Sequence, residues 1–114
     1  MINTLHIKNM GIIDEITLDL NEGFNVITGE TGAGKTLIIG SLQILAGGRF
    51  SKEIIRHGEK NSFVEMSIYL PNAGYEEDTV IVSREINING KNTCKINGRL
   101  VTVNELREFM KGII

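Results

Sequence analysis

The stretch GETGAGKT at residues 29–36 has the residue types and the spacing that hold a phosphate chain. It fits a pattern of glycine, four residues, glycine, lysine and then serine or threonine. Glycines let the backbone turn its N–H groups inward as an anion-binding nest, the lysine adds a mobile positive charge, and the threonine hydroxyl can bind Mg²⁺. The pattern predicts a site for the phosphates of a nucleotide and for Mg²⁺, with Thr36 as metal ligand, made by Gly29, Glu30, Thr31, Gly32, Ala33, Gly34, Lys35 and Thr36.

The segments on either side of this loop fit a strand before it and a helix after it. Residues 24–28, FNVIT, are mostly apolar and read as a buried strand, whereas residues 37–46, LIIGSLQILA, are apolar nearly all round a helix. Strand, glycine loop and helix is the arrangement that supports a phosphate-binding interpretation. Gly47 and Gly48 are expected to end the helix, because glycine readily adopts the left-handed conformation found there.

Alternating apolar and polar residues predict strands both before and after this βα unit. Residues 5–9 and 12–20 alternate and are joined through Gly11. Antiparallel strands are also predicted over about 62–97, where the Asn-Gly pair at 89–90 signals a hairpin. A second Asn-Gly pair, at 97–98, is expected to turn the chain again.

A final helix is predicted at about 103–112. Thr102 and Glu105 have the spacing of a capping box, and the apolar residues that follow fall on one helical face. Because neither a linker nor a repeat divides the chain, residues 1–114 are interpreted as a single domain. The predicted fold class is α/β, a P-loop NTPase lobe that combines a P-loop βα unit with an antiparallel β subdomain.

Composition narrows the classes of function. The net charge of −2 and the isoelectric point near 5.7 argue against gripping nucleic acid by overall charge. The longest apolar run, at 37–46, is too short to cross a membrane. The single cysteine, Cys94, suits a reducing cytoplasm and is interpreted as a packed thiol. His6 and His57 lack partners at metal-ligand spacing.

Longer stretches carry a resemblance to a known group. The run LHIKNMGIIDEITLDLNEGFNVITGETGAGKT resembles the N-terminal head segment of the ABC-type ATPases of the SMC, RecF and RecN group. The stretches TGETGAGKT, LAGGR, IRHGE and KINGRLVTVNELRE are similar to the RecN family of bacterial DNA repair proteins in particular. The resemblance covers essentially the whole chain, and it implies an ABC-type N-terminal lobe that is incomplete without a C-terminal head segment.

The resemblance also implies partners and a location. A RecN-like protein would act in DNA double-strand-break repair and recombination, in the cytoplasm, and associated with the nucleoid at sites of damage. Its N-terminal lobe would join the C-terminal head segment, and two complete heads would enclose ATP. DNA would be bound through the full protein, and no membrane would be involved.

Other parts of such an ATPase are not identifiable here. The only glutamine, Gln43, lies within the helix after the loop, and no serine-glycine-glycine signature segment occurs. The acidic residues at 76–78 follow a turn rather than an apolar strand, so they do not form a Walker B motif. Because phosphoryl transfer needs a positioned water as well as a phosphate cradle, this chain alone is predicted to bind nucleotide but not to hydrolyse it.

Two positions depart from the family pattern, and two arginines are further site candidates. Gly40 stands where RecN heads usually carry an acid, and Thr36 replaces the more usual serine but keeps the hydroxyl. Arg49 is a possible phosphate or ribose neighbour, although pairing with a helix C-terminus explains it equally well. Arg56 resembles an arginine that lies near the nucleotide or senses DNA in related heads, and an exposed loop arginine is the alternative.

Two other functions stay open from sequence alone. The first is a self-contained small P-loop kinase or NTPase, which would need an acidic base that the chain does not clearly supply. The second is a non-catalytic interaction module with a vestigial loop. In the RecN-like interpretation, the missing C-terminal lobe is expected to leave apolar surface on the strands and on the final helix, and so to cause self-association.

Overall fold

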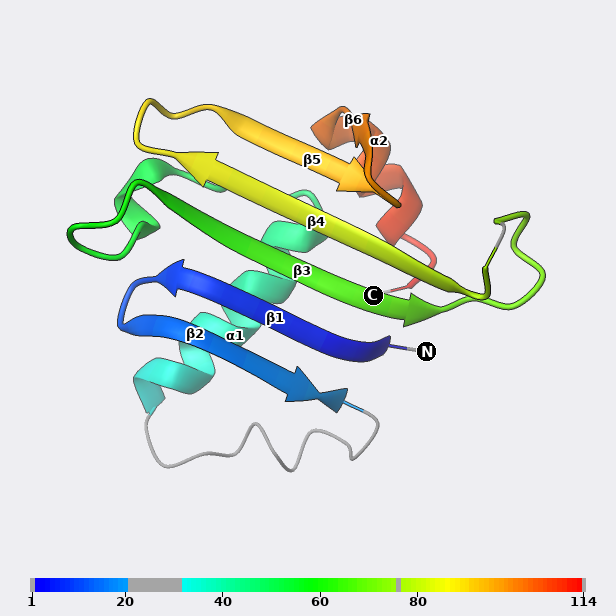
Figure 1. Ribbon diagram of the computed structural model, residues 1–114, viewed down its shortest axis with the longest axis horizontal. Helices are drawn as coiled ribbons and strands as arrows, with labels where there is room; N and C mark the ends of the chain where they lie inside the picture. Colours follow the sequence, from blue (N-terminus) through cyan, green and yellow to red (C-terminus); the bar gives the residue numbers. More distant parts are fainter. Residues whose placement is uncertain (1, 21–31, 76, 114) are drawn as a thin grey trace.

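The described residues of the protein form one six-stranded sheet in the order β2-β1-β3-β4-β5-β6 (Figure 1). The structure, a computed structural model, describes residues 2–20, 32–75 and 77–113. Every neighbouring pair of strands is antiparallel. The elements are β1 (Ile2–Met10), β2 (Ile13–Asp19), α1 (Gly32–Leu45), the 3-10 helix η3 (Lys52–Ile54), β3 (Asn61–Tyr69), β4 (Thr79–Asn87), β5 (Asn92–Ile96), β6 (Arg99–Val101) and α2 (Val103–Met110).

The strands predicted at 5–9, at 12–20 and within about 62–97 are observed, and they are joined by a pairing that the sequence did not predict. β1 lies between β2 and β3, although α1 separates β1 from β3 along the chain. Leu5 pairs with Met66, and the hydroxyls of Thr4 and Ser67 are 2.6 Å apart across the same two strands. The early hairpin and the later strands therefore form one continuous sheet.

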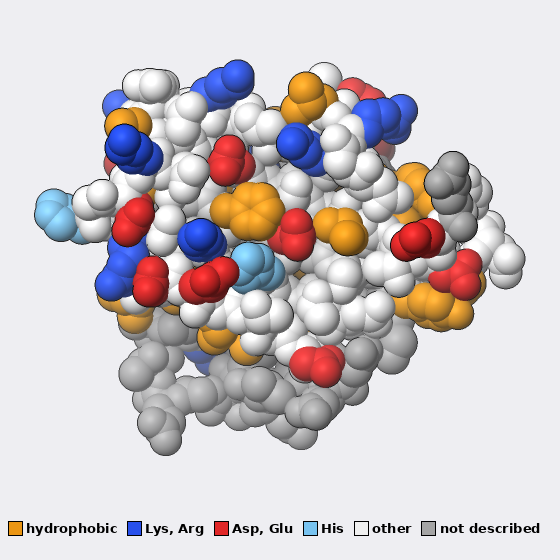
Figure 2. Space-filling model, viewed as in Figure 1, with side chains coloured by type: hydrophobic (Ala, Val, Ile, Leu, Met, Phe, Trp, Pro, Cys, Tyr) orange, Lys and Arg blue, Asp and Glu red, His pale blue; other side chains and the backbone are white. Residues whose placement is uncertain are grey.

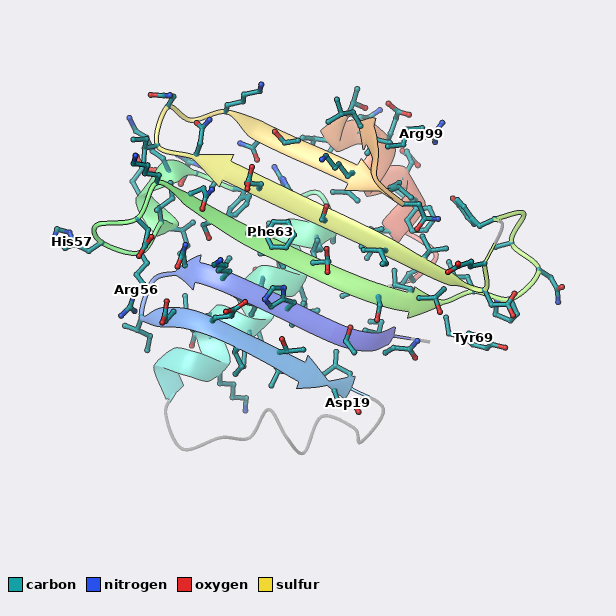
Figure 3. The ribbon with its side chains drawn as sticks, in the orientation of Figure 1. Asp19, Arg56, His57, Phe63, Tyr69 and Arg99 are labelled. Atoms are coloured by element: carbon teal, nitrogen blue, oxygen red, sulfur yellow. The ribbon has the colours of Figure 1, made fainter. Side chains whose placement is uncertain are left out.

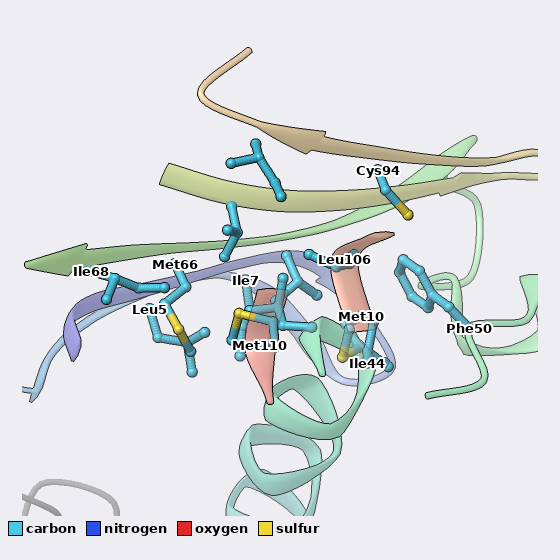
Figure 4. Packing of buried hydrophobic residues seen from close by; sticks show 14 of the residues in the cluster. Leu5, Ile7, Met10, Ile44, Phe50, Met66, Ile68, Cys94, Leu106 and Met110 are labelled. Atoms are coloured by element: carbon cyan, nitrogen blue, oxygen red, sulfur yellow. The ribbon is translucent and has the colours of Figure 1, made fainter. Parts of the chain in front are cut away.

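Both helices cover the same face of this sheet and bury the core between the two layers (Figure 4). Alternate residues of the central strands point into that core, as expected for a sheet with one covered face. α1 contributes residues spaced at three and four positions, which places them on one side of the helix. The fully or almost fully buried core residues are Leu5, Ile7, Met10, Leu45, Val64, Met66, Ile68, Val80, Val82, Ile86, Leu106 and Met110.

Helix α2 begins with the predicted capping box. The Glu105 amide donates to the Thr102 hydroxyl at 3.0 Å, and the Thr102 amide donates to the Glu105 carboxylate at 3.1 Å. The prediction that this helix leaves its apolar face uncovered is wrong. Leu106 and Met110 are buried against the core of this same chain, because α2 folds back onto the end of the sheet that carries β5.

Apolar exposure on the strands and turns is scattered. The exposed large apolar residues of the described chain are Ile12, Ile39, Tyr69, Tyr75, Ile81, Ile88 and Leu100. Self-association through them stays a prediction. Within the described residues, no helix combines the length and the apolar character needed to cross a bilayer.

Replacing Gly40 by alanine is expected to raise the free energy of unfolding by about 1 kcal/mol, because glycine is a poor helix former. A Cβ built at Gly40 meets no atom within 4 Å, so nothing opposes the gain. Urea unfolding followed by circular dichroism measures it. As a matched control, Gly47→Ala should destabilise the protein, since Gly47 has a φ of +96° and its Cβ would lie 2.7 Å from the Cβ of Arg107. A lower urea midpoint for Gly40→Ala would contradict the prediction.

Candidate functional site

The last two residues of the phosphate-binding pattern lie in the first turns of α1. Lys35 and Thr36 are both exposed there. The first four amides of a helix have no partner within the helix, and the helix dipole adds partial positive charge at this end. No acid occupies the first turn of α1. This end of the helix therefore combines a lysine, a hydroxyl and backbone donors, all of which suit an anion.

The remainder of the pattern is only partly covered by the structure. Residues 32–34 are helical, but their side chains are outside the described set. The predicted strand at 24–28 and the loop residues Gly29, Glu30 and Thr31 lie outside the described residues. Their roles in holding a nucleotide stay predictions.

A turn from the early hairpin braces the start of α1. Gly11 has a φ of +54°, and a Cβ added to it would lie 3.3 Å from Leu37, the residue after Thr36. Arg56 holds this turn from the other side: its Nη1 donates to the Ile12 carbonyl at 2.8 Å (Figure 3). The structure therefore brings Arg56, through this turn, to the end of α1 that carries Lys35, and the Arg56 guanidinium donates to a backbone carbonyl there.

The other end of α1 closes as predicted, with glycine in the left-handed conformation. Gly47 has a φ of +96°, and the Gly48 amide donates to the Gln43 carbonyl at 2.9 Å. A Cβ at Gly48 would lie 2.7 Å from that same carbonyl oxygen. Two consecutive glycines thus let the chain leave the helix sharply and run back along the sheet.

A buried arginine donates hydrogen bonds to the backbone at this C-terminal end of α1. Arg84 of β4 is 4% exposed, and its Nη1 donates to the Ile44 carbonyl at 2.8 Å and also to the Gly48 carbonyl. Its Nε donates to the Asn92 side-chain oxygen at 3.2 Å, and its guanidinium carbon lies 5.6 Å from the centre of the Phe50 ring. Asn92 in turn donates to the Phe50 carbonyl at 3.1 Å. Arg84 thus adds a donor from the sheet to the Ile44 carbonyl, which also accepts from the Gly47 amide at 3.1 Å, and to the Gly48 carbonyl just beyond α1.

The charge of Arg84 suits its place at the negative end of the helix dipole. Burial is the main cause that lowers the pKa of this guanidinium from its ordinary value. Arginine nevertheless stays protonated in proteins, because its ordinary pKa lies far above neutral pH. Among the described residues, every buried side-chain nitrogen or oxygen has a hydrogen-bond partner, so this cation is held in a fully satisfied network.

A second arginine reaches the same helix end from α2. Arg107 Nη2 donates to the Gly47 carbonyl at 3.0 Å, although the Arg107 side chain is exposed. Arg49, the sequence candidate, is exposed just beyond α1 and lines an open hollow with Ile44 and Phe50. Arg49 therefore follows the C-terminal end of the helix, away from its first turn, and its predicted nucleotide contact stays a prediction.

Sequence reasoning missed Arg84, but the pattern of β4 held a signal. Val80, Val82 and Ile86 point inward, and Arg84 occupies the inward position between Val82 and Ile86. A charged residue in the apolar phase of a strand is seldom buried without a partner. The inward position of Arg84 on β4 therefore indicates that its side chain donates to an acceptor inside the protein. The sequence does not show that the acceptors are carbonyls at the end of α1.

The structure also describes both histidines and two of the three acidic residues at 76–78. The described residues contain no group of three or more His, Cys, Asp or Glu that could hold a metal ion. His6 Nε2 lies 2.7 Å from a Glu15 carboxylate oxygen across the β1–β2 pair. Glu77 and Asp78 are exposed, whereas Glu76 lies outside the described residues.

The uncovered face of the sheet carries a shallow hollow of about 250 Å³. Figure 2 shows this face as a mixture of acidic, basic and apolar side chains. The hollow is lined by Phe63, Glu65, Ile81, Ser83, Glu85, Thr93, Lys95 and Gly98. Because α1 lies behind the sheet, this hollow is separate from the first turn of α1.

Cys94 is a packed thiol, as predicted. It is 3% exposed, and burial raises its pKa, with the nearby Arg84 charge opposing the rise. A raised pKa means that the thiol contributes stability below the pKa of the unfolded chain, about 8.5, and that this contribution is lost as pH rises through the folded pKa. The stability difference between the protein and its Cys94→Ala variant should therefore shrink as the pH rises above about 8.5. Urea unfolding at several pH values measures it, and a pH-independent difference would contradict the prediction.

Comparison with known proteins agrees with the sequence resemblance. A family model described as an AAA domain matches residues 4–114. The DNA repair protein RecN of Bacillus subtilis (strain 168) is 38% identical over 122 residues, which cover 96% of this chain and 21% of that protein. RecN of Halalkalibacterium halodurans is 37% identical, covering 100% of this chain and 22% of that protein. The chain thus spans about a fifth of the length of the curated relatives that it matches.

Solved structures show the same fold at lower sequence identity. A structure from work on ATP-driven dimerization and DNA-stimulated activation of SMC ATPases aligns with a TM-score of 0.80 and 22% identity, covering 96% of this chain and 76% of that one. The SMC head domain from Thermotoga maritima aligns with a TM-score of 0.67 and 19% identity, covering 95% of this chain and 41% of that one. The fold is therefore that of the ABC-type N-terminal lobe expected from the sequence.

Proposed function

Because the chain belongs to the AAA domain family, whose model matches residues 4–114, we propose that it is the ATP-binding N-terminal part of a RecN-like ATPase in DNA double-strand-break repair and recombination. The observation that carries the proposal is the exposed pair Lys35 and Thr36 at the start of α1, in a chain that matches RecN proteins along 96–100% of its length. A self-contained kinase or NTPase is not favoured, because it would not account for a match that includes the early hairpin and α2.

The site would hold ATP with Mg²⁺ through residues 29–36. Backbone amides of the loop and of the first turn of α1 would surround the phosphates, and Lys35 would place its charge near the β and γ phosphates. Thr36 would supply one oxygen to Mg²⁺, a cation that keeps several of its waters and needs few protein ligands. The metal would supply charge neutralisation along the phosphate chain.

The outward side of α1 offers a surface for the rest of a head. Ile39 is 46% exposed, and Gly40 and Gln43 share that side of the helix. A C-terminal head segment of the same protein would cover this side and supply the acidic residues that the chain lacks. A second head would then complete the ATP site, and DNA would be bound by the full protein in the cytoplasm, at damaged regions of the nucleoid.

Calorimetric titration of the purified chain with ATP, with and without Mg²⁺, tests this proposal, together with a phosphate-release assay in the presence and absence of duplex DNA ends. We expect Mg²⁺-dependent binding without turnover in either condition. Steady turnover by the chain alone would favour a self-contained enzyme. Absence of binding by a chain that is folded by circular dichroism would favour the interaction module with a vestigial loop.

A further inference from the structure

Hydrogen bonds from the sheet hold helix α1 at the end opposite Lys35 and Thr36. Apolar packing of Ile38, Ile44 and Leu45 holds the helix against the sheet, but apolar contacts have no preferred direction. Hydrogen bonds, by contrast, are directional. The Nη1 atom of Arg84 donates to the carbonyl of Ile44 in α1 and to the carbonyl of Gly48 just beyond it. Ile44 belongs to the helix, so sliding or rotation of α1 would break the buried bond from Arg84 to the Ile44 carbonyl.

A small tilt of α1 about its C-terminal end displaces the residues at its N-terminal end. It has 14 residues and is thus about 21 Å long, so a tilt of about 5° at the gripped end moves the first turn by about 2 Å. Displacements of about 1 Å are enough to weaken a binding constellation strongly. Near the other end of α1, a Cβ added to Gly11 would lie 3.3 Å from Leu37, so the early hairpin lies close to that end while Arg84 holds the C-terminal end.

We propose that Arg84 is a positioning residue for the nucleotide site, which fixes the place of Lys35 and Thr36 by holding the C-terminal end of α1 to β4. The inference rests on the proposed function. It assigns the buried arginine of the sheet to the affinity of a site at the opposite end of the helix, and it makes no claim of contact between Arg84 and nucleotide.

The test compares Arg84→Lys with the unaltered full-length protein. Lysine keeps the charge, but it lacks the planar fork that reaches Asn92 and the α1 carbonyls together. We expect the Kd for Mg-ATP, measured by titration under conditions in which each protein is fully folded, to rise about tenfold. Hydrogen exchange of the α1 amides from Lys35 onward should also become faster. The ratio of ATP affinity to adenosine affinity should fall, because only the phosphate contacts depend on the first turn.

Val80→Ala is the matched control, because Val80 is fully buried on the same strand but has no bond to α1. It should lower the thermal midpoint without changing the Kd for Mg-ATP. An unchanged Kd in Arg84→Lys, or an equal loss in Val80→Ala, would overturn the inference. If the unaltered protein does not bind Mg-ATP, the proposed function fails. Hydrogen exchange then decides whether Arg84 positions the helix. Unchanged exchange at the first turns of α1 in Arg84→Lys would overturn the positioning role of Arg84 too.

Discussion

Replacing Lys35 by alanine is expected to weaken Mg-ATP binding by about 100-fold, equivalent to about 3 kcal/mol, which is the upper range for a hydrogen bond to a charged group. Lys35 is exposed in the first turn of α1. Its removal therefore takes no packing from the core, and alanine is an equally good helix former. The loss should appear in affinity and leave the thermal midpoint within about 3 °C. Titration calorimetry and thermal unfolding measure the two quantities.

The phosphate chain supplies an internal control for this prediction. The lysine of a P-loop reaches the β and γ phosphates, so Lys35→Ala should weaken ATP and ADP but leave AMP and adenosine nearly unaffected. Lys52→Ala, which removes another exposed lysine in η3, should change none of these affinities. An equal loss for ATP and adenosine would contradict the assigned role of Lys35, because it would indicate a general disturbance of the site.

Short sequence patterns predicted many of the strands, turns and helix ends, because each of these features forms from interactions within a few consecutive residues. The capping box of Thr102 and Glu105 needs only four consecutive residues, and the left-handed Gly47 needs only the end of one helix. Alternation predicted the strands for the same reason. By contrast, the pairing of β1 with β3 depends on segments that lie on opposite sides of α1 in the chain, and no local pattern encodes which edges meet.

The candidate site likewise has one part that the local sequence predicts and another that depends on tertiary contacts. The spacing of residues 29–36 predicts chemistry on its own, because one loop supplies all the donors. Arg84 acts on that chemistry only through contacts of β4 with the carbonyls of α1, which are main-chain atoms and leave no trace in residue identity. Arg56 was noticed for its resemblance to a nucleotide or DNA contact, but its hydrogen bond to the Ile12 carbonyl comes from tertiary structure.

Replacing Arg84 by methionine is expected to lower the free energy of unfolding by about 3 kcal/mol, because three partly or fully buried acceptors lose a donor and each group left unsatisfied costs about 1–3 kcal/mol. The acceptors are the carbonyls of Ile44 and Gly48 and the side-chain oxygen of Asn92. Of these, the Ile44 carbonyl keeps the Gly47 amide as a second donor at 3.1 Å. Methionine fills similar space and removes the cost of burying a charge, which opposes the loss. Exchanging whole buried ion pairs for apolar residues is often neutral, but here the backbone carbonyls stay behind and cannot be exchanged. Urea unfolding followed by circular dichroism measures the difference.

Arg107→Met is the matched control, because it removes a second arginine from the same helix end but breaks only the bond from an exposed side chain to the Gly47 carbonyl. Water can replace that donor, so the expected loss is below about 1 kcal/mol. The contrast separates the two effects that compete at Arg84. If Arg84→Met were as stable as the original protein, the desolvation cost of the buried guanidinium would equal the worth of its three hydrogen bonds, and α1 would be held to the sheet by apolar packing alone.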